Sequence, residues 1–212
     1  MSVSILNRRT AVLGLMAPAL LAGCGSHGAS YAALMPEDMT QGDPNAKVTV
    51  VEYASVACPI CGRWFREVYP DFKAKYIDTG KVHFVYREML VGNSDEVTVA
   101  ASGFLLARCA GKDKYFSVVD AIYRSQPGLF DQPRQVLLNI AASAGFNQAQ
   151  FDACVKNDAA LQALAKRVDA NSKRDNVNAT PTFVINGKVL QAGYQPLTTL
   201  DAEIAKAMAA VK

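Results

Sequence analysis

Two cysteines separated by two residues, Cys58 and Cys61, constrain this chain more than any other feature. They follow the apolar, β-branched run 48–53, which predicts that a buried strand passes into a helix at the pair. A helix N-terminus offers unpaired N–H groups and the positive end of the macrodipole, and both stabilise the thiolate of Cys58. Cys61 lies one turn further on and faces back toward Cys58. The spacing therefore predicts a redox-active dithiol.

Pro59 suits this position, because the first turn of a helix tolerates a residue without an N–H. Stabilising the Cys58 thiolate stabilises the reduced pair, so the disulfide form becomes an oxidant. The alternative is half of a zinc site, which needs a second ligand pair. The sequence offers only isolated residues for such a pair: Cys24, Cys109, Cys154, His27 and His83. We therefore expect no metal site and no cofactor.

The N-terminal segment has the pattern of an export signal. Two arginines precede an uncharged apolar stretch over residues 11–22, which is short for a membrane span. The stretch ends in Leu-Ala-Gly-Cys, which resembles the bacterial lipobox and makes Cys24 the lipid-modified first residue of the mature chain. The alternative is an ordinary secretory signal that leaves Cys24 as a free thiol. We expect residues 1–24 to be a lipoprotein signal peptide and residues 25–45 a tether.

The charge balance argues against a nucleic-acid partner. Without Arg8 and Arg9 of the signal segment, the 22 basic side chains fall to 20, against 19 acidic ones. A balance so close to neutral leaves no basic footprint for nucleic acid and no polybasic patch for lipid.

Cys109 and Cys154 remain once the dithiol and the lipidation site are assigned. In an oxidising compartment we expect them to form a structural disulfide. The alternative is a pair of buried thiols that pack as small hydrophobic side chains. A bridge between positions 45 residues apart would stabilise the fold by about 4 kcal/mol in the loop-entropy description.

The segment around the dithiol predicts a strand–helix–strand unit. Strands are expected over residues 47–54 and 81–87 from their β-branched and alternating patterns. The helix between them, over residues 59–77, carries the dithiol and is expected to kink at Pro70.

Residues 94–170 carry apolar side chains at helical spacing and predict an inserted bundle of four or five helices. Breaks are expected at Gly111, Pro127–Gly128, Pro133 and Gly145. After the bundle, Asn186–Gly187 predicts the turn of a β-hairpin between 182–185 and 188–190, and residues 196–211 form an amphipathic helix.

This order of elements predicts an α/β protein, a thioredoxin fold with an inserted helical bundle. The thioredoxin part comprises residues 46–93 and 171–212, and the insert comprises 94–170. With the dithiol, and the turn Ala-Thr-Pro-Thr at 179–182 about 120 residues later, the sequence resembles the DsbA-like branch of the thioredoxin superfamily. The resemblance covers nearly all of residues 45–212.

The resemblance implies that the bond before Pro181 is cis and that this proline lies against the dithiol, since X–Pro is the bond at which cis costs little. Thr180 is then expected to present backbone groups to an extended substrate chain. The substrate-binding residues expected on this basis are Thr180, Pro181, Pro59 and Ile60.

Glu52, six residues before Cys58, matches a buried acid of these proteins. A carboxyl group in such a place has a raised pKa and could pass protons to or from Cys61. The alternative is that Glu52 points to solvent, and the alternation of the strand leaves both orientations open.

Two positions depart from the strong oxidants of this branch. Ile60 stands where those proteins carry a histidine whose charge helps hold the thiolate, so a milder oxidant is expected. At position 180 the chain carries threonine, as the disulfide isomerases do, whereas the oxidases more often carry valine at the matching position. Residues 25–45 are, however, too few for the separate dimerisation domain of such isomerases.

The sequence as a whole predicts a periplasmic thiol:disulfide oxidoreductase, anchored to a bacterial membrane by lipid, that oxidises exported cysteine-containing proteins. The resemblance implies re-oxidation by a quinone-linked membrane partner, and the chain is expected to be a monomer. Two alternatives stay open: an isomerase or reductase kept reduced by a membrane donor, and a peptide-binding module that does not use its dithiol.

Overall fold

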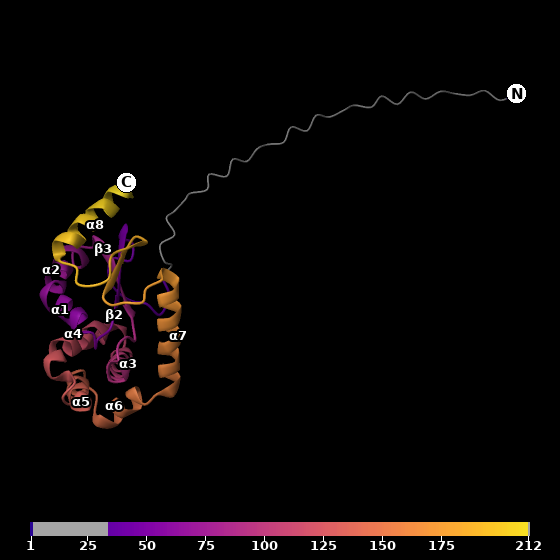
Figure 1. The fold of residues 1–212 in the computed structure, drawn as a ribbon. Coiled ribbons are helices and arrows are strands. Elements are labelled where there is room, and N and C mark those ends of the chain that lie inside the picture. Colours follow the sequence, from indigo (N-terminus) through magenta and orange to yellow (C-terminus); the bar gives the residue numbers. More distant parts are fainter. Residues whose placement is uncertain (2–33, 212) are drawn as a thin grey trace.

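The computed structural model describes Met1 and residues 34–211, which form a five-stranded sheet with helices around it (Figure 1). Apart from Met1, the predicted signal peptide with Cys24 and the first part of the predicted tether lie outside the described residues. Among the described residues, every helix is too short or too polar to cross a membrane. The strands are β1 (Met39–Gly42), β2 (Val48–Ala54), β3 (Val82–Glu88), β4 (Thr182–Ile185) and β5 (Lys188–Val189).

Strand β2 lies at the centre of the sheet, whose order within the described residues is β1-β3-β2-β4-β5. It runs parallel to β3 and antiparallel to β4. A parallel neighbour requires a crossover connection, and the helices that follow β2 supply it. The predicted thioredoxin fold with a helical insertion is confirmed.

The crossover carries the dithiol on α1 (Pro59–Glu67), followed by α2 (Tyr69–Phe72) and a π-helical turn, η1 (Lys73–Ile77). The predicted interruption of this helix is confirmed: α1 ends before Val68, and Pro70 lies in the first turn of α2. The interruption follows from proline chemistry, since Pro70 cannot donate an N–H to the preceding turn.

The insert contains five helices within residues 94–175; in Figure 1, α3 to α6 lie below the sheet and α7 runs alongside it. Gly111, with φ of 85°, separates the first two, and Gly145, with φ of 96°, follows the third. The helices are α3 (Ser94–Cys109), α4 (Lys112–Leu129), α5 (Pro133–Ser143), α6 (Gln148–Val155) and α7 (Asp158–Asp175).

The break expected at Pro127–Gly128 is wrong, because α4 continues through both residues to Leu129. A proline at position 127 removes the helical donor to the carbonyl of Tyr123, four residues earlier. The side chain of Arg66, on α1, donates to that carbonyl instead, at 2.7 Å. A contact from another element therefore keeps α4 intact at its C-terminal end.

Two predicted boundaries are also wrong. Residues 39–42, expected in the tether, form the edge strand β1, which pairs antiparallel with β3 and buries Met39. The expected end of the insert at residue 170 falls inside α7, which reaches Asp175. No glycine or proline interrupts this helix before Asn176, which ends it in the left-handed conformation with φ of 52°.

The C-terminal segment is as predicted. Asn186 and Gly187 have φ of 44° and 83° and connect the hairpin strands β4 and β5. Positive φ at both positions is the signature of the type I′ turn that Asn-Gly favours. The amphipathic helix α8 (Leu197–Ala210) follows and buries Leu200 and Ile204.

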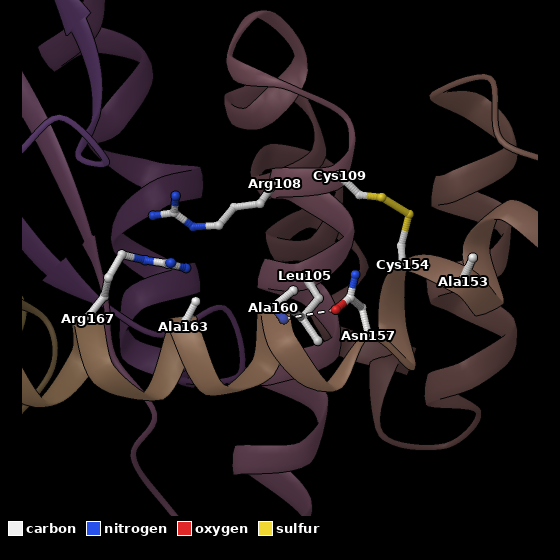
Figure 2. A pocket seen from close by; sticks show the side chains of 9 residues that line it. All are labelled: Leu105, Arg108, Cys109, Ala153, Cys154, Asn157, Ala160, Ala163 and Arg167. Carbon is white, nitrogen blue, oxygen red and sulfur yellow. Dashed lines mark hydrogen bonds between the residues drawn. A yellow bond between two sulfur atoms is a disulfide. The ribbon is translucent and has the colours of Figure 1, made fainter.

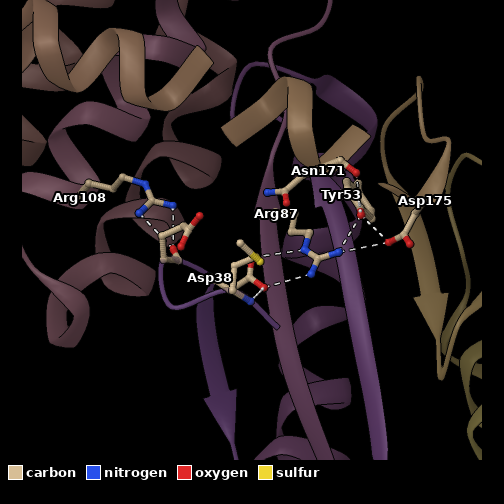
Figure 3. A network of polar contacts seen from close by, with 8 residues as sticks. Asp38, Tyr53, Arg87, Arg108, Asn171 and Asp175 are labelled. Carbon is tan, nitrogen blue, oxygen red and sulfur yellow. Dashed lines mark hydrogen bonds and ion pairs between the residues drawn. The ribbon is translucent and has the colours of Figure 1, made fainter. Parts of the chain in front are cut away.

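A buried polar network fastens α7 to the back of the sheet (Figure 3). Arg87 of β3 bonds to Asp38 at 3.1 Å and to Asp175 at 3.2 Å. Next to it, Arg108 of α3 bonds to Glu88 at 2.6 Å. Breaking a buried pair of this kind destabilises a protein by about 3–5 kcal/mol, so the network fixes the insert against the sheet.

Candidate active site

Cys58 is the N-cap of α1, in extended conformation with φ of −73° and ψ of 120°. The tight turn that brings it there is closed by its own N–H, which donates to the carbonyl of Ser55 at 3.0 Å. Pro59 occupies the first turn of the helix, as the sequence predicts. The chain therefore leaves the central strand and presents the Cys58 sulfur at a helix N-terminus.

The Cys58 sulfur lies between α1 and the segment that leads into β4. It accepts a hydrogen bond from the Cys61 N–H at 3.4 Å and lies 3.7 Å from the carbonyl oxygen of Thr180. The Thr180–Pro181 peptide bond is cis. The structure thus places the dithiol beside the turn 122 residues later in the chain.

The surroundings of Cys58 favour its thiolate. The hydrogen bond with the Cys61 side chain contributes most, and the Thr180 side chain and the N–H groups of Cys61 and Ile60 add to it. Together they outweigh the effect of burial and lower the pKa of Cys58 from 9.0 to about 6. At neutral pH the reduced protein therefore carries Cys58 mainly as the thiolate.

Cys61 has the opposite character. Its side chain is fully buried, and burial, followed by the hydrogen bond with Cys58, raises its pKa well above the ordinary value. The two sulfurs are therefore unequal: Cys58 is partly exposed and acidic, whereas Cys61 is enclosed and remains a thiol. This asymmetry makes Cys58 the sulfur that an incoming thiolate can reach.

Glu52 is completely buried on β2, between Tyr86 of β3 and Phe183 of β4. Its side chain does not face solvent, which was the alternative that the sequence left open. Neither carboxyl oxygen has a hydrogen-bond partner within the described part of the chain. Burial, and then the charge on Cys58, raise the pKa of Glu52 well above 4.5. A carboxyl group whose protonated form is favoured by burial therefore lies close enough to both cysteines to interact with them electrostatically.

The four residues expected to bind substrate differ in exposure. Ile60 is 48% exposed, a large value for an apolar side chain next to the dithiol. Pro59 is exposed and Thr180 half-buried, whereas Pro181 is buried. The exposed residues Pro59 and Ile60 therefore directly follow the half-buried Cys58 in the chain.

Cys109 and Cys154 form a disulfide between the end of α3 and α6, with their Cα atoms 5.9 Å apart. The bridge borders a pocket of about 510 Å³, which Arg108 and Arg167 also line (Figure 2). Neither Cys58 nor Cys61 lines the cavity, so the bridge belongs to the insert and not to the dithiol site. Among the described residues, no cluster of His, Cys, Asp or Glu could hold a metal ion.

Sequence patterns did not reveal the contacts that the insert makes with the dithiol loop. Tyr123 of α4 places its hydroxyl 3.3 Å from the carbonyl of Ser55 and 2.7 Å from the hydroxyl of Tyr86. Gln126, one turn later, reaches the same loop. Both occur in an ordinary amphipathic helix, and nothing in its spacing marks them.

The family model described as Thioredoxin matches residues 34–202. The chain belongs to the thioredoxin family. Among the solved structures similar to this thioredoxin-family chain is alpha-DsbA1 of Wolbachia pipientis, at 24% identity with a TM-score of 0.72. That match covers 87% of this chain and 100% of the other. BdbD of Bacillus subtilis matches at 21% identity with a TM-score of 0.64, covering 81% and 93%. The family match confirms the predicted membership of the thioredoxin family, and the two structures confirm the predicted fold.

Curated relatives are named for disulfide chemistry. A Rickettsia conorii protein named for protein-disulfide oxidoreductase activity is 29% identical over 174 residues, covering 81% of this chain and 60% of its own length. A Bacillus anthracis protein named for disulfide bond formation is 28% identical over 173 residues, covering 78% and 77%. This thioredoxin-family chain thus spans about 60% of the length of the Rickettsia relative.

Proposed function

We propose that the chain is a thiol:disulfide oxidoreductase that acts as a dithiol oxidase through Cys58 and Cys61. The observation that carries this proposal is the asymmetric pair, with a partly exposed, acidic Cys58 capping α1 and a buried Cys61 behind it. The names of the curated relatives support the same chemistry. Stabilising one thiolate of a reduced pair favours the reduced form, so the oxidised pair accepts electrons.

The reaction begins with the Cys58–Cys61 disulfide. A substrate thiolate attacks the Cys58 sulfur, forms a mixed disulfide and releases Cys61 as a thiolate. A second substrate thiolate then attacks the substrate sulfur of the mixed disulfide and releases the Cys58 thiolate. The substrate has lost two electrons and gained a disulfide, and the Cys58–Cys61 pair has gained the two electrons.

Glu52 supplies the proton that this sequence requires. The Cys61 thiolate is released into a buried environment that strongly favours the neutral thiol. Glu52, held uncharged by burial, gives its proton to Cys61, and the reverse transfer accompanies re-oxidation. Within the described residues its carboxyl group has no hydrogen-bond partner, a cost in stability that this role explains.

The substrate lies across Pro59, Ile60, Thr180 and Pro181. An extended chain at Thr180 pairs with exposed backbone groups, which recognises the unfolded state and not a particular sequence. The half-exposed Ile60 adds an apolar contact beside the attacked sulfur. Such a surface suits exported proteins whose cysteines are not yet folded away.

The cellular setting follows from the N-terminal sequence. Signal cleavage before Cys24 and lipidation of that residue tether the domain to a membrane on the periplasmic side. A quinone-linked membrane enzyme re-oxidises the reduced pair, and the domain works as a monomer.

The insert spans residues 94–175, and the thioredoxin part spans residues 38–93 and 176–211.

An isomerase or reductase kept reduced by a membrane donor is the second candidate. The observation that favours it is Ile60, which provides no positive charge next to the Cys58 thiolate. A non-catalytic peptide-binding module is less consistent with the two opposite pKa shifts at the pair.

The test uses the chain with Cys24→Ser and reduced, unfolded ribonuclease A. The oxidised protein is expected to introduce disulfides at a rate proportional to its concentration, and Cys58→Ser is expected to abolish transfer. Thiol loss in the ribonuclease and reduction of the Cys58–Cys61 pair are measured together. Transfer that survives Cys58→Ser would refute the dithiol mechanism, and reduction of insulin disulfides without oxidation of ribonuclease would establish the reductase alternative.

A further inference from the structure

The C-terminal turn of α4 reaches from the helical insert into the dithiol loop, and α4 packs along α1 (Figure 1). The side-chain amide of Gln126 donates to the carbonyl of Val56 at 2.9 Å and to the carbonyl of Cys58 at 3.0 Å. These carbonyls belong to the segment that connects β2 to α1. One side chain of the insert therefore holds the backbone on both sides of the turn that presents Cys58.

Neighbouring groups fix the amide in this orientation. Arg66 donates to the Gln126 Oε1 atom at 3.2 Å, which leaves the Nε2 group directed at the loop. Arg66 also donates to the carbonyl of Tyr123, the acceptor freed by Pro127. The proline in α4 thus creates the acceptor that helps to place Arg66 next to Gln126.

Gly62 provides the space that the amide occupies. A Cβ atom at this position of α1 would lie 1.8 Å from Oε1 and 2.8 Å from Nε2 of Gln126. Glycine inside a helix is destabilising relative to alanine, so its presence directly after Cys61 needs a reason. Contact with the Gln126 amide supplies that reason, and the two residues form a matched pair.

We propose that Gln126 is a positioning residue for the dithiol, which holds the Val56 and Cys58 carbonyls and so fixes the N-cap geometry of Cys58. The inference rests on the proposed function and assigns part of it to the insert. The Cys58 sulfur accepts the Cys61 N–H only in the N-cap conformation. Gln126 restricts the loop to that conformation. Its loss removes this donor from the Val56 carbonyl and leaves the Cys58 carbonyl with the Gly62 N–H alone, at 3.1 Å, so the turn before α1 is less restrained.

The test compares Gln126→Met with Gln135→Met in the full chain carrying Cys24→Ser. Methionine keeps the length of the side chain and removes both donors. Gln135 is a matched control, because it bonds only within α5, to Asn139 at 2.9 Å, in an exposed position. The readouts are the pKa of Cys58 from thiolate absorbance, the equilibrium of the pair with glutathione, and the melting temperature.

Gln126→Met is expected to raise the pKa of Cys58 by about 0.5–1 unit, a three- to tenfold loss of thiolate stabilisation. The glutathione equilibrium is expected to move in the same direction, toward a less oxidising pair. Gln135→Met is expected to change neither. A folded Gln126→Met protein with an unchanged pKa and an unchanged equilibrium would overturn the inference, even if it melted at a lower temperature.

Gly62→Ala provides a second, independent perturbation. In the presence of Gln126 the added methyl group displaces the amide, so the pKa of Cys58 is expected to rise as in Gln126→Met. In a Gln126→Ala background the same change meets no amide and is expected to leave the pKa alone and to raise the melting temperature. Equal pKa shifts in both backgrounds would show that the amide is not the cause and would overturn the inference.

These outcomes separate the inference from the proposed function. A parent protein whose Cys58 titrates near 9 and does not exchange with glutathione would defeat both. If the parent protein exchanges with glutathione and Gln126→Met has the same Cys58 pKa and the same glutathione equilibrium, the inference alone is defeated.

Discussion

Replacing Glu52 by methionine is expected to stabilise the oxidised protein while slowing its reaction. The Glu52 side chain is fully buried, and both of its oxygens lack a hydrogen-bond partner in the described part of the chain. Burying a polar group without a partner costs about 1–3 kcal/mol. Methionine has a similar shape and needs no hydrogen-bond partner, so the free energy of unfolding should rise by about 1–3 kcal/mol at pH 4.5. At that pH the ionisation of Glu52 contributes little to the difference.

The gain should grow with pH. Burial raises the pKa of Glu52 in the folded protein, whereas in the unfolded chain the group ionises near 4.5. Between these two values the folded state binds more protons than the unfolded state, so stability falls as pH rises. Each pH unit above 4.5 therefore adds about 1.4 kcal/mol to the advantage of methionine, until the pH reaches the pKa of Glu52 in the folded protein.

The assay is urea unfolding of the oxidised protein at pH 5, 6 and 7, followed by circular dichroism and by the fluorescence of Trp64. The oxidised state keeps Cys58 and Cys61 from titrating. Glu52→Gln is the matched control, because it keeps a buried polar group that does not ionise and should remove only the pH dependence. A destabilised Glu52→Met protein, or a stability difference that stays constant with pH, would refute this account of Glu52.

Three further predictions test other parts of the structure. In the reduced protein, Cys58 should be alkylated with a midpoint near pH 6 while Cys61 stays unmodified, as mass spectrometry of the peptides would show; a midpoint near 9 would contradict the contacts described for the sulfur. Replacing Cys109 and Cys154 together by alanine should lower the free energy of unfolding by about 4 kcal/mol in urea, for a loop of 45 residues. A change in the alkylation midpoint of Cys58 in that double variant would show that the bridge also affects the dithiol. Ile60→His should lower the pKa of Cys58 by about half a unit. The effect requires a charged imidazole and is therefore expected at pH values below about 6.5. An unchanged titration would mean that residue 60 does not act on the thiolate.

Local patterns were enough to predict the fold. The dithiol after a β-branched run, the helical spacing of the insert and the Asn186–Gly187 turn each specify short-range structure, and their order specifies the topology. Strand β1 was missed because its four residues, with only Met39 buried, carry no periodic pattern. The end of α7 was missed because no glycine or proline marks it: the helix ends at Asn176, which adopts the left-handed conformation.

The candidate site was predictable where it is local and unpredictable where it depends on packing. The spacing of Cys58 and Cys61 encodes their own geometry. The orientation of Glu52 could not be read from alternation, because its neighbours Val51 and Tyr53 are also buried, on the other face of the sheet. Gln126 lies 68 residues from Cys58, and only the packing of α4 against α1 brings the two together.

The most direct test of the central claim is the reduction potential of the Cys58–Cys61 pair, measured by equilibrium with glutathione in the chain with Cys24→Ser. The pKa of Cys58, about 6, lies between those of thioredoxin, about 7, and DsbA, about 3.5, whose potentials are about −270 and −120 mV. A dithiol oxidase with this pair should therefore have a potential between about −230 and −120 mV. A potential below about −230 mV would contradict the claim, because such a pair lies toward thioredoxin, at about −270 mV, and gives electrons to its substrates.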